Sequence, residues 1–137
     1  MNRRIATFTL ASFTLLSGTA FAIAALKANA TAALAAFNDK NNKDYHDRDL
    51  YVFCYNMTDG NFTAHVNPAM MGKDVRSLKS GDDPLGQRIF DTIKNAAEGT
   101  TSTVDYKFPK PGTTEPLPKE SYVGRIGNEG CGVGYYK

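Results

Sequence analysis

The chain has 137 residues, with 16 Lys and Arg against 14 Asp and Glu, which gives a formal net charge of +2. This length holds one domain, and so small a net charge excludes the broad electrostatic binding of nucleic acid, which needs a clustered basic face. Apolar residues make up 42% of the chain, as in ordinary globular proteins, and two cysteines are too few for a cysteine-rich zinc module or a disulfide-dense scaffold.

The first 22 residues have the pattern of a secretory signal peptide. Two arginines precede the uncharged stretch 5–26, and Ala-Phe-Ala at 20–22 is a small-x-small cleavage site. We therefore expect a signal peptide at 1–22, cleavage after Ala22 and a periplasmic or secreted domain at 23–137. An uncleaved membrane anchor is the alternative, because about 20 uncharged residues can span a bilayer. Seven Thr, Ser and Gly residues make the stretch only weakly apolar, which favours cleavage.

A helix and a hairpin are predicted in the first half of the exported part. Apolar residues of 26–37 recur at helical spacing, and the polar residues 38–43 end this helix. Residues 51–55 (Tyr-Val-Phe-Cys-Tyr) are rich in β-formers. Asp59-Gly60 then favours a hairpin turn into a returning strand at 61–65.

A helical insert and three further strands are predicted after the hairpin. Glycines and prolines keep 69–86 to short elements. We expect Asp83 to cap a helix that has Pro84 at its first position and ends at Gly99. Strands follow at 102–108, 119–126 and 131–136, with a proline-rich loop at 109–118 between the first two. This order predicts an α+β fold with a five-stranded antiparallel sheet.

Motifs spread along the exported chain together resemble one known family. They are Asp49-Leu50-Tyr51-Val52-Phe53, Asp59-Gly60, Ala64-His65-x-Asn67-Pro68, Gly72-Lys73-Asp74, Val104 to Pro111, Pro118-Lys119-x-Ser121-Tyr122-Val123 and Gly132-Val133-Gly134-Tyr135-Tyr136. In this order they resemble the single Cache domain of type 2 over about residues 26–137. The resemblance implies a PAS-like sheet of strand order 2-1-5-4-3, with an N-terminal helix and a helical insert between strands 2 and 3. It also implies an extracytoplasmic sensor of small carboxylates such as acetate, propionate, lactate or pyruvate.

Two features depart from the usual members of that family. The N-terminal helix is short, and no second transmembrane helix, HAMP segment or output domain follows Lys137. We therefore expect a standalone exported Cache domain, either a monomer or a weak homodimer. A membrane receptor or kinase is its candidate protein partner.

The resemblance also pairs the two cysteines. In the implied strand order the first and last strands are neighbours, which places Cys54 beside Cys131. In an oxidising compartment such a pair would form a disulfide. Two buried free thiols that behave as small apolar residues are the alternative.

The resemblance places a ligand pocket between one sheet face and the helical insert. Alternation gives Tyr51, Phe53 and Tyr55 one face and Val52 and Cys54 the other, and the residues alone leave open which face carries the pocket. By resemblance, Phe53 and Tyr55 take the pocket side.

A carboxylate ligand needs a cation and several hydrogen-bond donors in a partly dry cavity. Lys119 is the predicted charge partner, and Tyr106 and Ser121 are candidate hydroxyl donors. His65 is a further candidate donor, and Met71 is a candidate for an adaptable lid. The plain alternatives are a solvated hairpin lysine, a strand-end histidine and a core methionine.

The residues predict a non-catalytic protein without a metal site or cofactor. His46 and His65 are isolated, and no Gly-x-Ser-x-Gly or His-x-x-x-His spacing occurs. The competing function is a protein-interaction module that regulates a membrane receptor or kinase without a ligand of its own.

Overall fold

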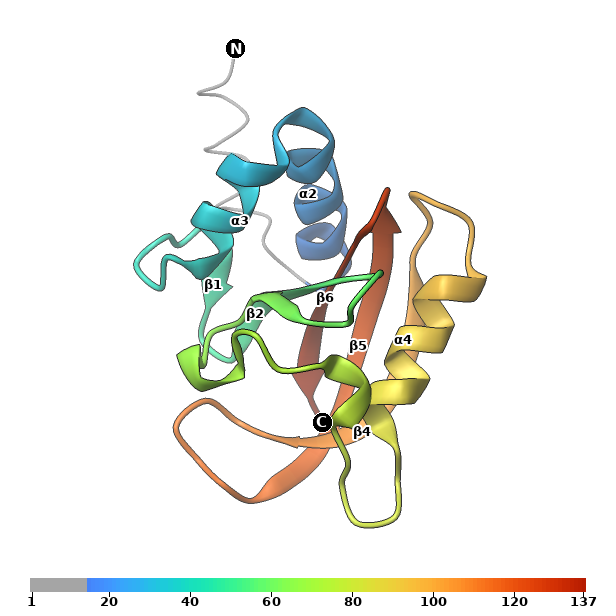
Figure 1. The fold of residues 1–137 in the computed structure, drawn as a ribbon. Helices are drawn as coiled ribbons and strands as arrows, with labels where there is room; N and C mark the ends of the chain where they lie inside the picture. Colours follow the sequence, from blue (N-terminus) through green and yellow to red (C-terminus); the bar gives the residue numbers. More distant parts are fainter. Residues whose placement is uncertain (1–14) are drawn as a thin grey trace.

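The structure is a computed structural model that describes residues 15–137; residues 1–14, which carry the first part of the predicted signal peptide, lie outside the described residues. Within this range an antiparallel sheet carries helices on both faces (Figure 1). The strands are β1 (His46–Asp47), β2 (Leu50–Asn56), β3 (Phe62–Ala64), β4 (Ser102–Pro109), β5 (Pro116–Ile126) and β6 (Glu129–Tyr136). The helices are α2 (Leu15–Ala28), α3 (Ala30–Asn38) and α4 (Leu85–Asn95), with 3-10 helices η1 (Pro68–Met70) and η2 (Val75–Ser77). The predicted α+β class with an antiparallel sheet is confirmed.

Strand β2 joins the two halves of the sheet. One edge of β2 pairs with β6, which is followed by β5 and β4, and the other edge pairs with β1 and β3. The prediction of five strands is wrong by one, because β1 consists of two polar residues that carry no β pattern. The loop predicted at 109–118 is also too long, since β4 and β5 stay paired as far as Pro109 and Pro116.

The N-terminal helical part is broken at Asn29. Its backbone is extended, with φ −165°, and its side-chain oxygen accepts a hydrogen bond from the backbone N–H of Ala32. An asparagine in this position caps a new helix in place of continuing the old one. The prediction of a single helix over 26–37 is therefore wrong, because α2 ends and α3 begins inside that range.

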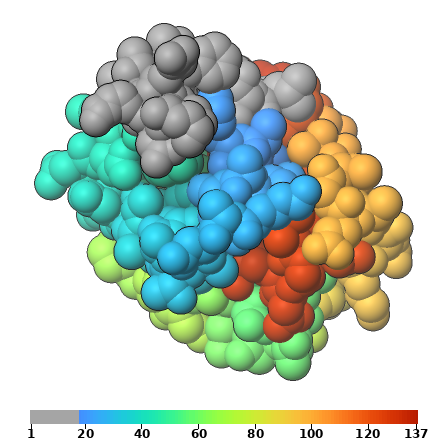
Figure 2. Space-filling view, turned by 90° about the horizontal axis from the view of Figure 1, so that it is seen from above, coloured from blue at the N-terminus to red at the C-terminus, as the bar shows by residue number. Residues whose placement is uncertain are grey.

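Helices α2 and α3 cover one face of the sheet. Figure 2 looks onto this side, where the two helices, in blue to cyan, lie beside the red C-terminal strands. Ala22, Leu26 and Phe37 pack there against Val52 and Val133, and all five side chains are almost completely buried. This layer is an apolar core, so a ligand site is sought on the opposite face.

Helix α2 runs through the predicted cleavage position. Ala22 is fully buried, and the hydroxyl of Thr19 donates a 3.0 Å hydrogen bond to the backbone carbonyl of Tyr122 in β5. Within residues 15–137, no helix combines the length and the apolar character needed to cross a membrane. Cleavage after Ala22 stays a prediction.

The insert between β3 and β4 differs from its prediction at both ends of its helix. Asp83 does not cap α4: Pro84 stands at the cap without a side-chain bond, and Asp83 forms an ion pair with Arg88 at 2.8 Å. The helix ends at Asn95, before Gly99, because the chain already turns extended at the next residue. Gly86 lets α4 approach η2 closely, since a Cβ there would lie 1.7 Å from the carbonyl oxygen of Val75.

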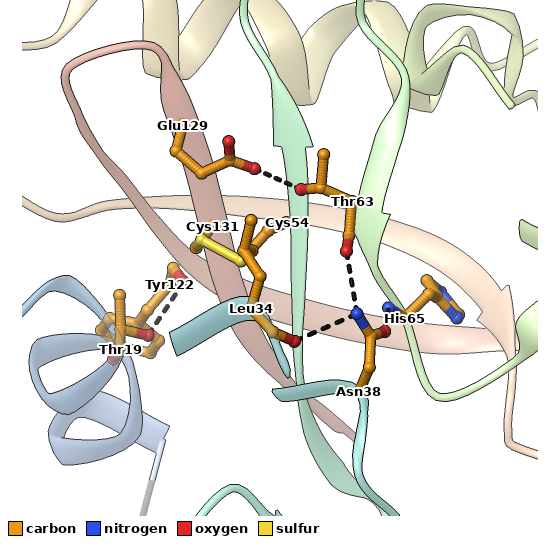
Figure 3. The surroundings of a disulfide bond; sticks show 9 residues. All are labelled: Thr19, Leu34, Asn38, Cys54, Thr63, His65, Tyr122, Glu129 and Cys131. Atoms are coloured by element: carbon orange, nitrogen blue, oxygen red, sulfur yellow. Dashed lines mark hydrogen bonds between the residues drawn. A yellow bond between two sulfur atoms is a disulfide. The ribbon is translucent and has the colours of Figure 1, made fainter. Parts of the chain in front are cut away.

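The disulfide between Cys54 and Cys131 is present, with an S–S distance of 2.08 Å, which confirms the predicted pair. The two residues stand directly opposite each other in the β2–β6 register, on the face that α2 and α3 cover. Figure 3 shows the bond between the two strands, close to the residues that anchor α3. It closes a loop across a sequence separation of 77 residues and so restricts the unfolded chain.

Candidate ligand-binding site

The glycines of β6 leave room on the face that α4 covers. Gly132 and Gly134 alternate with Cys131 and Val133, whose side chains point to the helices α2 and α3. A Cβ on Gly134 would lie 2.6 Å from Cε of Lys119, and one on Gly132 would lie 2.6 Å from the ring of Phe53. Large side chains of β2 and β5 therefore meet across β6 because β6 contributes none of its own there.

Lys119 lies in the middle of this face and is only 2% exposed. Its Nζ donates a 3.1 Å hydrogen bond to the hydroxyl of Tyr51. Five aromatic rings surround the ammonium at centroid distances of 4.5 Å (Tyr51), 5.1 Å (Tyr136), 5.4 Å (Phe108), 5.7 Å (Phe53) and 5.8 Å (Tyr106). Aromatic faces attract a cation, but they do not replace the anion that a buried ammonium would pair with.

Burial alone lowers the pKa of Lys119 from 10.5 to about 7. No ion pair to this lysine is present within residues 15–137. With a pKa of about 7 and no counter-ion, the amine of Lys119 is divided about equally between its charged and neutral forms at pH 7.

His65 faces the same cavity and is 6% exposed. Its Nδ1 accepts a 2.9 Å hydrogen bond from the backbone N–H of Asn67, so the proton of the neutral ring belongs on Nε2. Burial, with a smaller effect from Lys119, lowers the pKa of His65 to about 3. At neutral pH this residue therefore acts as a neutral donor.

Asn38, the last residue of α3, holds the backbone of His65 in place. Its side-chain NH₂ donates to the carbonyls of Leu34 and Thr63 at 3.1 and 2.9 Å, and its side-chain oxygen accepts from the N–H of His65 at 3.1 Å. Figure 3 shows this amide between α3 and the strand that carries Thr63. The helix layer on one face of the sheet is thereby linked to a residue of the cavity on the other.

The cavity between the sheet and α4 is small. Its volume is about 20 Å³, little more than one water molecule needs. A second hollow of about 190 Å³ adjoins it between the residues after β3 and the β4–β5 loop, and Tyr51, His65 and Phe108 line both. The second hollow is the larger of the two, and the shared residues place it beside the cavity that Lys119 lines.

The structure brings four of the predicted site residues together and sets three apart. Lys119, Tyr106, His65 and Phe53 line the cavity. Ser121 is buried behind it, where its hydroxyl shares a 2.7 Å hydrogen bond with that of Tyr106.

Tyr55 and Met71 lie outside the cavity lining. Tyr55 is buried beside Phe62 and Phe90, and its hydroxyl donates to the carbonyl of Ile89 at 3.3 Å. Met71 is 41% exposed, whereas its neighbour Met70 is buried and lines the second hollow.

Three further residues belong to the site but were not predicted. Tyr51 carries the acceptor for Lys119, and its place on the Phe53 face is visible in the alternation of β2. Phe108 follows Tyr106 by two residues in β4, so strand alternation places both side chains on the same face. Tyr136 is found only from the register, in which it stands opposite Lys119.

The family and structural comparisons agree with this architecture. The family model described as Single Cache domain 2 matches residues 25–136. Among curated proteins, the methyl-accepting chemotaxis protein McpP of Pseudomonas putida is 28% identical over 79 residues, which are 57% of this chain. The matched part spans only 14% of that relative's length.

Solved structures share the fold at low sequence identity. A periplasmic sensor domain of a chemotaxis protein has a TM-score of 0.68 at 23% identity, covering 98% of this chain and 91% of the other. A Cache chemosensory domain, described with the structural basis of its carboxylic acid recognition, has a TM-score of 0.65 at 20% identity, with 98% and 89% covered. A methyl-accepting chemotaxis protein of Vibrio parahaemolyticus has a TM-score of 0.63 at 20% identity, with 85% and 81% covered.

Proposed function

The chain belongs to the Single Cache domain 2 family, and from this membership and the chemistry of its cavity we propose that it is a non-catalytic sensor domain that binds a small organic acid. The observation that carries the proposal is the position of Lys119, which is buried among aromatic rings with no anion of the described chain beside it. A bound carboxylate would supply that anion.

The groups around the cavity suit one carboxylate. Nζ of Lys119 would form the ion pair, and Nε2–H of His65 would donate a hydrogen bond. The rings of Phe53 and Phe108 would pack against a short apolar chain. One cation suits one carboxylate group, and the cavity of about 20 Å³ would have to widen towards the adjoining hollow of about 190 Å³ to hold an acid of two to four carbons. Carboxylic acid recognition by one of the similar Cache domains supports this class of ligand.

Isothermal titration calorimetry with acetate, propionate, lactate and pyruvate tests the proposal. The wild-type domain should bind at least one of them, and Lys119→Met should lose that binding, because a neutral side chain of similar length cannot form the ion pair. Lys107→Met, at an exposed position of β4, is the matched control and should bind as the wild type does. Unchanged affinity in Lys119→Met would remove Lys119 from the site.

The small size of the cavity favours a second candidate, a protein-interaction module that works without a ligand. A ligand that binds only the folded state must raise the midpoint of thermal unfolding. A thermal-shift screen of the same four acids that shows no stabilisation would favour this second function. The partner proposed in either case is a membrane receptor or kinase, which the chemotaxis relatives support.

Export to the periplasm or cell surface is proposed from the sequence pattern of residues 1–22 and from the periplasmic sensor domain of similar fold. For the fate of this segment, the burial of Ala22 and the bond between Thr19 and Tyr122 support the alternative in which it is retained. Cleavage after Ala22 would remove the first half of α2 from the sheet. N-terminal sequencing of protein purified from its native compartment distinguishes a start at Ile23 from an uncleaved N-terminus.

A further inference from the structure

We propose that this site takes up its carboxylate ligand together with one proton, so that the domain couples the sensing of an organic acid to the pH outside the cell. The inference rests on the proposed function and deepens it. The proton goes to Nζ of Lys119, and the product is an ammonium–carboxylate pair inside the aromatic cavity.

Among residues 15–137, the side chains that line the cavity around Lys119 include no permanent charge that would fix its protonation state. Strand β2 presents Tyr51 and Phe53, β4 presents Tyr106 and Phe108, and β6 presents Tyr136. The segment after β3 presents His65, which is neutral. Apolar side chains of β3, η2, the residues after η2 and α4 complete the lining: Phe62, Val75, Leu78, Leu85 and Ile89.

Charged groups at the rim of this layer pair with one another. Lys110, which lies over the Tyr136 ring, pairs with Asp49 at 3.5 Å. Arg88 of α4 pairs with Asp83 at 2.8 Å. Lys137 pairs with Asp105 at 2.8 Å, on the β4 face opposite to Tyr106. None of these groups shifts the pKa of Lys119, which is lowered by burial alone. The empty cavity therefore favours a neutral amine above pH 7.

A carboxylate changes this balance because it is the anion that the ammonium lacks. Charge pairing within about 4 Å in a cavity of low polarity raises the pKa of a lysine, commonly by one to three units. Binding above pH 7 is then the sum of three species: the carboxylate anion, the neutral amine and one proton from solution. The lone pair of Nζ accepts that proton, and no other bond forms or breaks.

The other titratable groups of the cavity are poor acceptors for the proton. Nδ1 of His65 already accepts the N–H of Asn67, and the pKa of this ring is about 3. The phenols of Tyr51 and Tyr106 have their pKa raised by burial, so they already carry their protons. Proton uptake on binding is therefore assigned to Lys119.

Calorimetric titration with propionate, and with acetate in parallel, tests the inference when each pH is measured in two buffers that release protons with different enthalpies. Phosphate and Tris serve at pH 8, and phosphate and MES serve at pH 6. If the bound carboxylate raises the pKa of Lys119 to about 10, the upper end of that range, we expect an uptake of about 0.9 proton per ligand at pH 8 and about 0.1 at pH 6. A smaller rise in the pKa gives a smaller uptake at pH 8. With the same bound-state pKa, the dissociation constant should change by only about twofold between pH 6 and pH 7 and rise nearly tenfold between pH 8 and pH 9.

Two variants identify the acceptor. His65→Gln keeps a neutral donor without a titrating ring, so it should still take up the proton even if its affinity falls. Lys119→Arg carries a permanent charge and should take up none. Proton uptake that persists in Lys119→Arg, or that disappears in His65→Gln, would overturn the assignment to Lys119.

Failure of the inference is distinguishable from failure of the proposed function. Clear binding heat with zero proton uptake and a dissociation constant that stays flat from pH 6 to pH 9 would contradict the inference and leave the carboxylate sensor intact. Absence of binding at pH 6 with all of acetate, propionate, lactate and pyruvate would contradict the proposed function, and the inference with it.

Discussion

Nζ of Lys119 in β5 reaches the hydroxyl of Tyr51 in β2 at 3.1 Å, across the intervening strand β6. The contact exists because Gly134 lies under the lysine chain, where a Cβ would stand 2.6 Å from Cε. A glycine without a side chain thus allows side chains from two strands that are not paired to meet in one buried position.

Substitution of Gly134 should disrupt the contact between Lys119 and Tyr51 across β6. In Gly134→Ala the new methyl group would lie 2.1 Å from Oγ of Ser121 as well as close to Lys119. We expect a loss of about 1–3 kcal/mol in the free energy of unfolding, as for other overpacked cores, and weaker carboxylate binding. Chemical denaturation measures the first and calorimetry the second, with the exposed Thr103→Ala as control. Wild-type stability in Gly134→Ala would contradict the close approach.

Removal of the buried amine should stabilise the empty domain. Folding lowers the pKa of Lys119 from 10.5 to about 7. At pH 7 the unfolded chain keeps this lysine charged in water, whereas folding must either bury the charge or remove the proton, and both lower the stability of the folded state. Lys119→Met should raise the free energy of unfolding by on the order of 3 kcal/mol at pH 7. The gain should shrink steadily from pH 7 to pH 10, because over this range the unfolded lysine holds a proton that the folded lysine has lost, so the stability of the wild type rises with pH. Urea denaturation at both pH values checks this, and a less stable variant at pH 7 would refute it.

Acid should destabilise the domain through His65. The unfolded histidine binds a proton below its usual pKa of 6.5, whereas the folded one does so only near a pKa of about 3. The unfolded state therefore holds more protons between these values, and this contribution to stability falls as the pH drops through that window. The full slope is about 1.4 kcal/mol per pH unit. His65→Gln should lose this component of the slope between pH 4 and pH 6, and a variant with an unchanged slope would contradict the burial of a neutral ring.

The disulfide should matter for stability and not for the ligand. Cys54 and Cys131 lie on the face that α2 and α3 cover, opposite to the cavity. The double variant Cys54→Ala/Cys131→Ala should lower the free energy of unfolding by about 2–4 kcal/mol and leave carboxylate affinity near that of the wild type. Titration of denatured, unreduced wild-type protein should find no free thiol. Two free thiols would contradict the bond.

Strand alternation and the family resemblance predict much of the site. Alternation places Phe53 on one face of β2, and the resemblance orients that face towards the insert, where the structure has the cavity. Tyr51 follows the same alternation, so it was available to the same reasoning. The place of Tyr136 could not be predicted in this way, because its position beside Lys119 depends on the pairing register of β5 with β6.

Positions outside regular strands were harder to predict. Met70 and Met71 are adjacent in and after a 3-10 helix, and periodicity does not tell which of two such neighbours is buried. Asn29 lies inside an alanine-rich run of helical spacing, yet its side chain ends one helix and caps the next. A local turn decides which methionine is buried, and one side-chain hydrogen bond decides where the helix ends. Hydrophobic periodicity, which is averaged over many residues, reveals neither.

In the proposed site, Lys119 supplies the charge that holds a small carboxylate. Calorimetry with propionate and acetate at pH 6, where the amine is charged, compares the wild type with Lys119→Met most directly. The account predicts saturable binding of at least one of the two acids by the wild type and by Lys107→Met, and none by Lys119→Met. Equal affinity of all three proteins would contradict it.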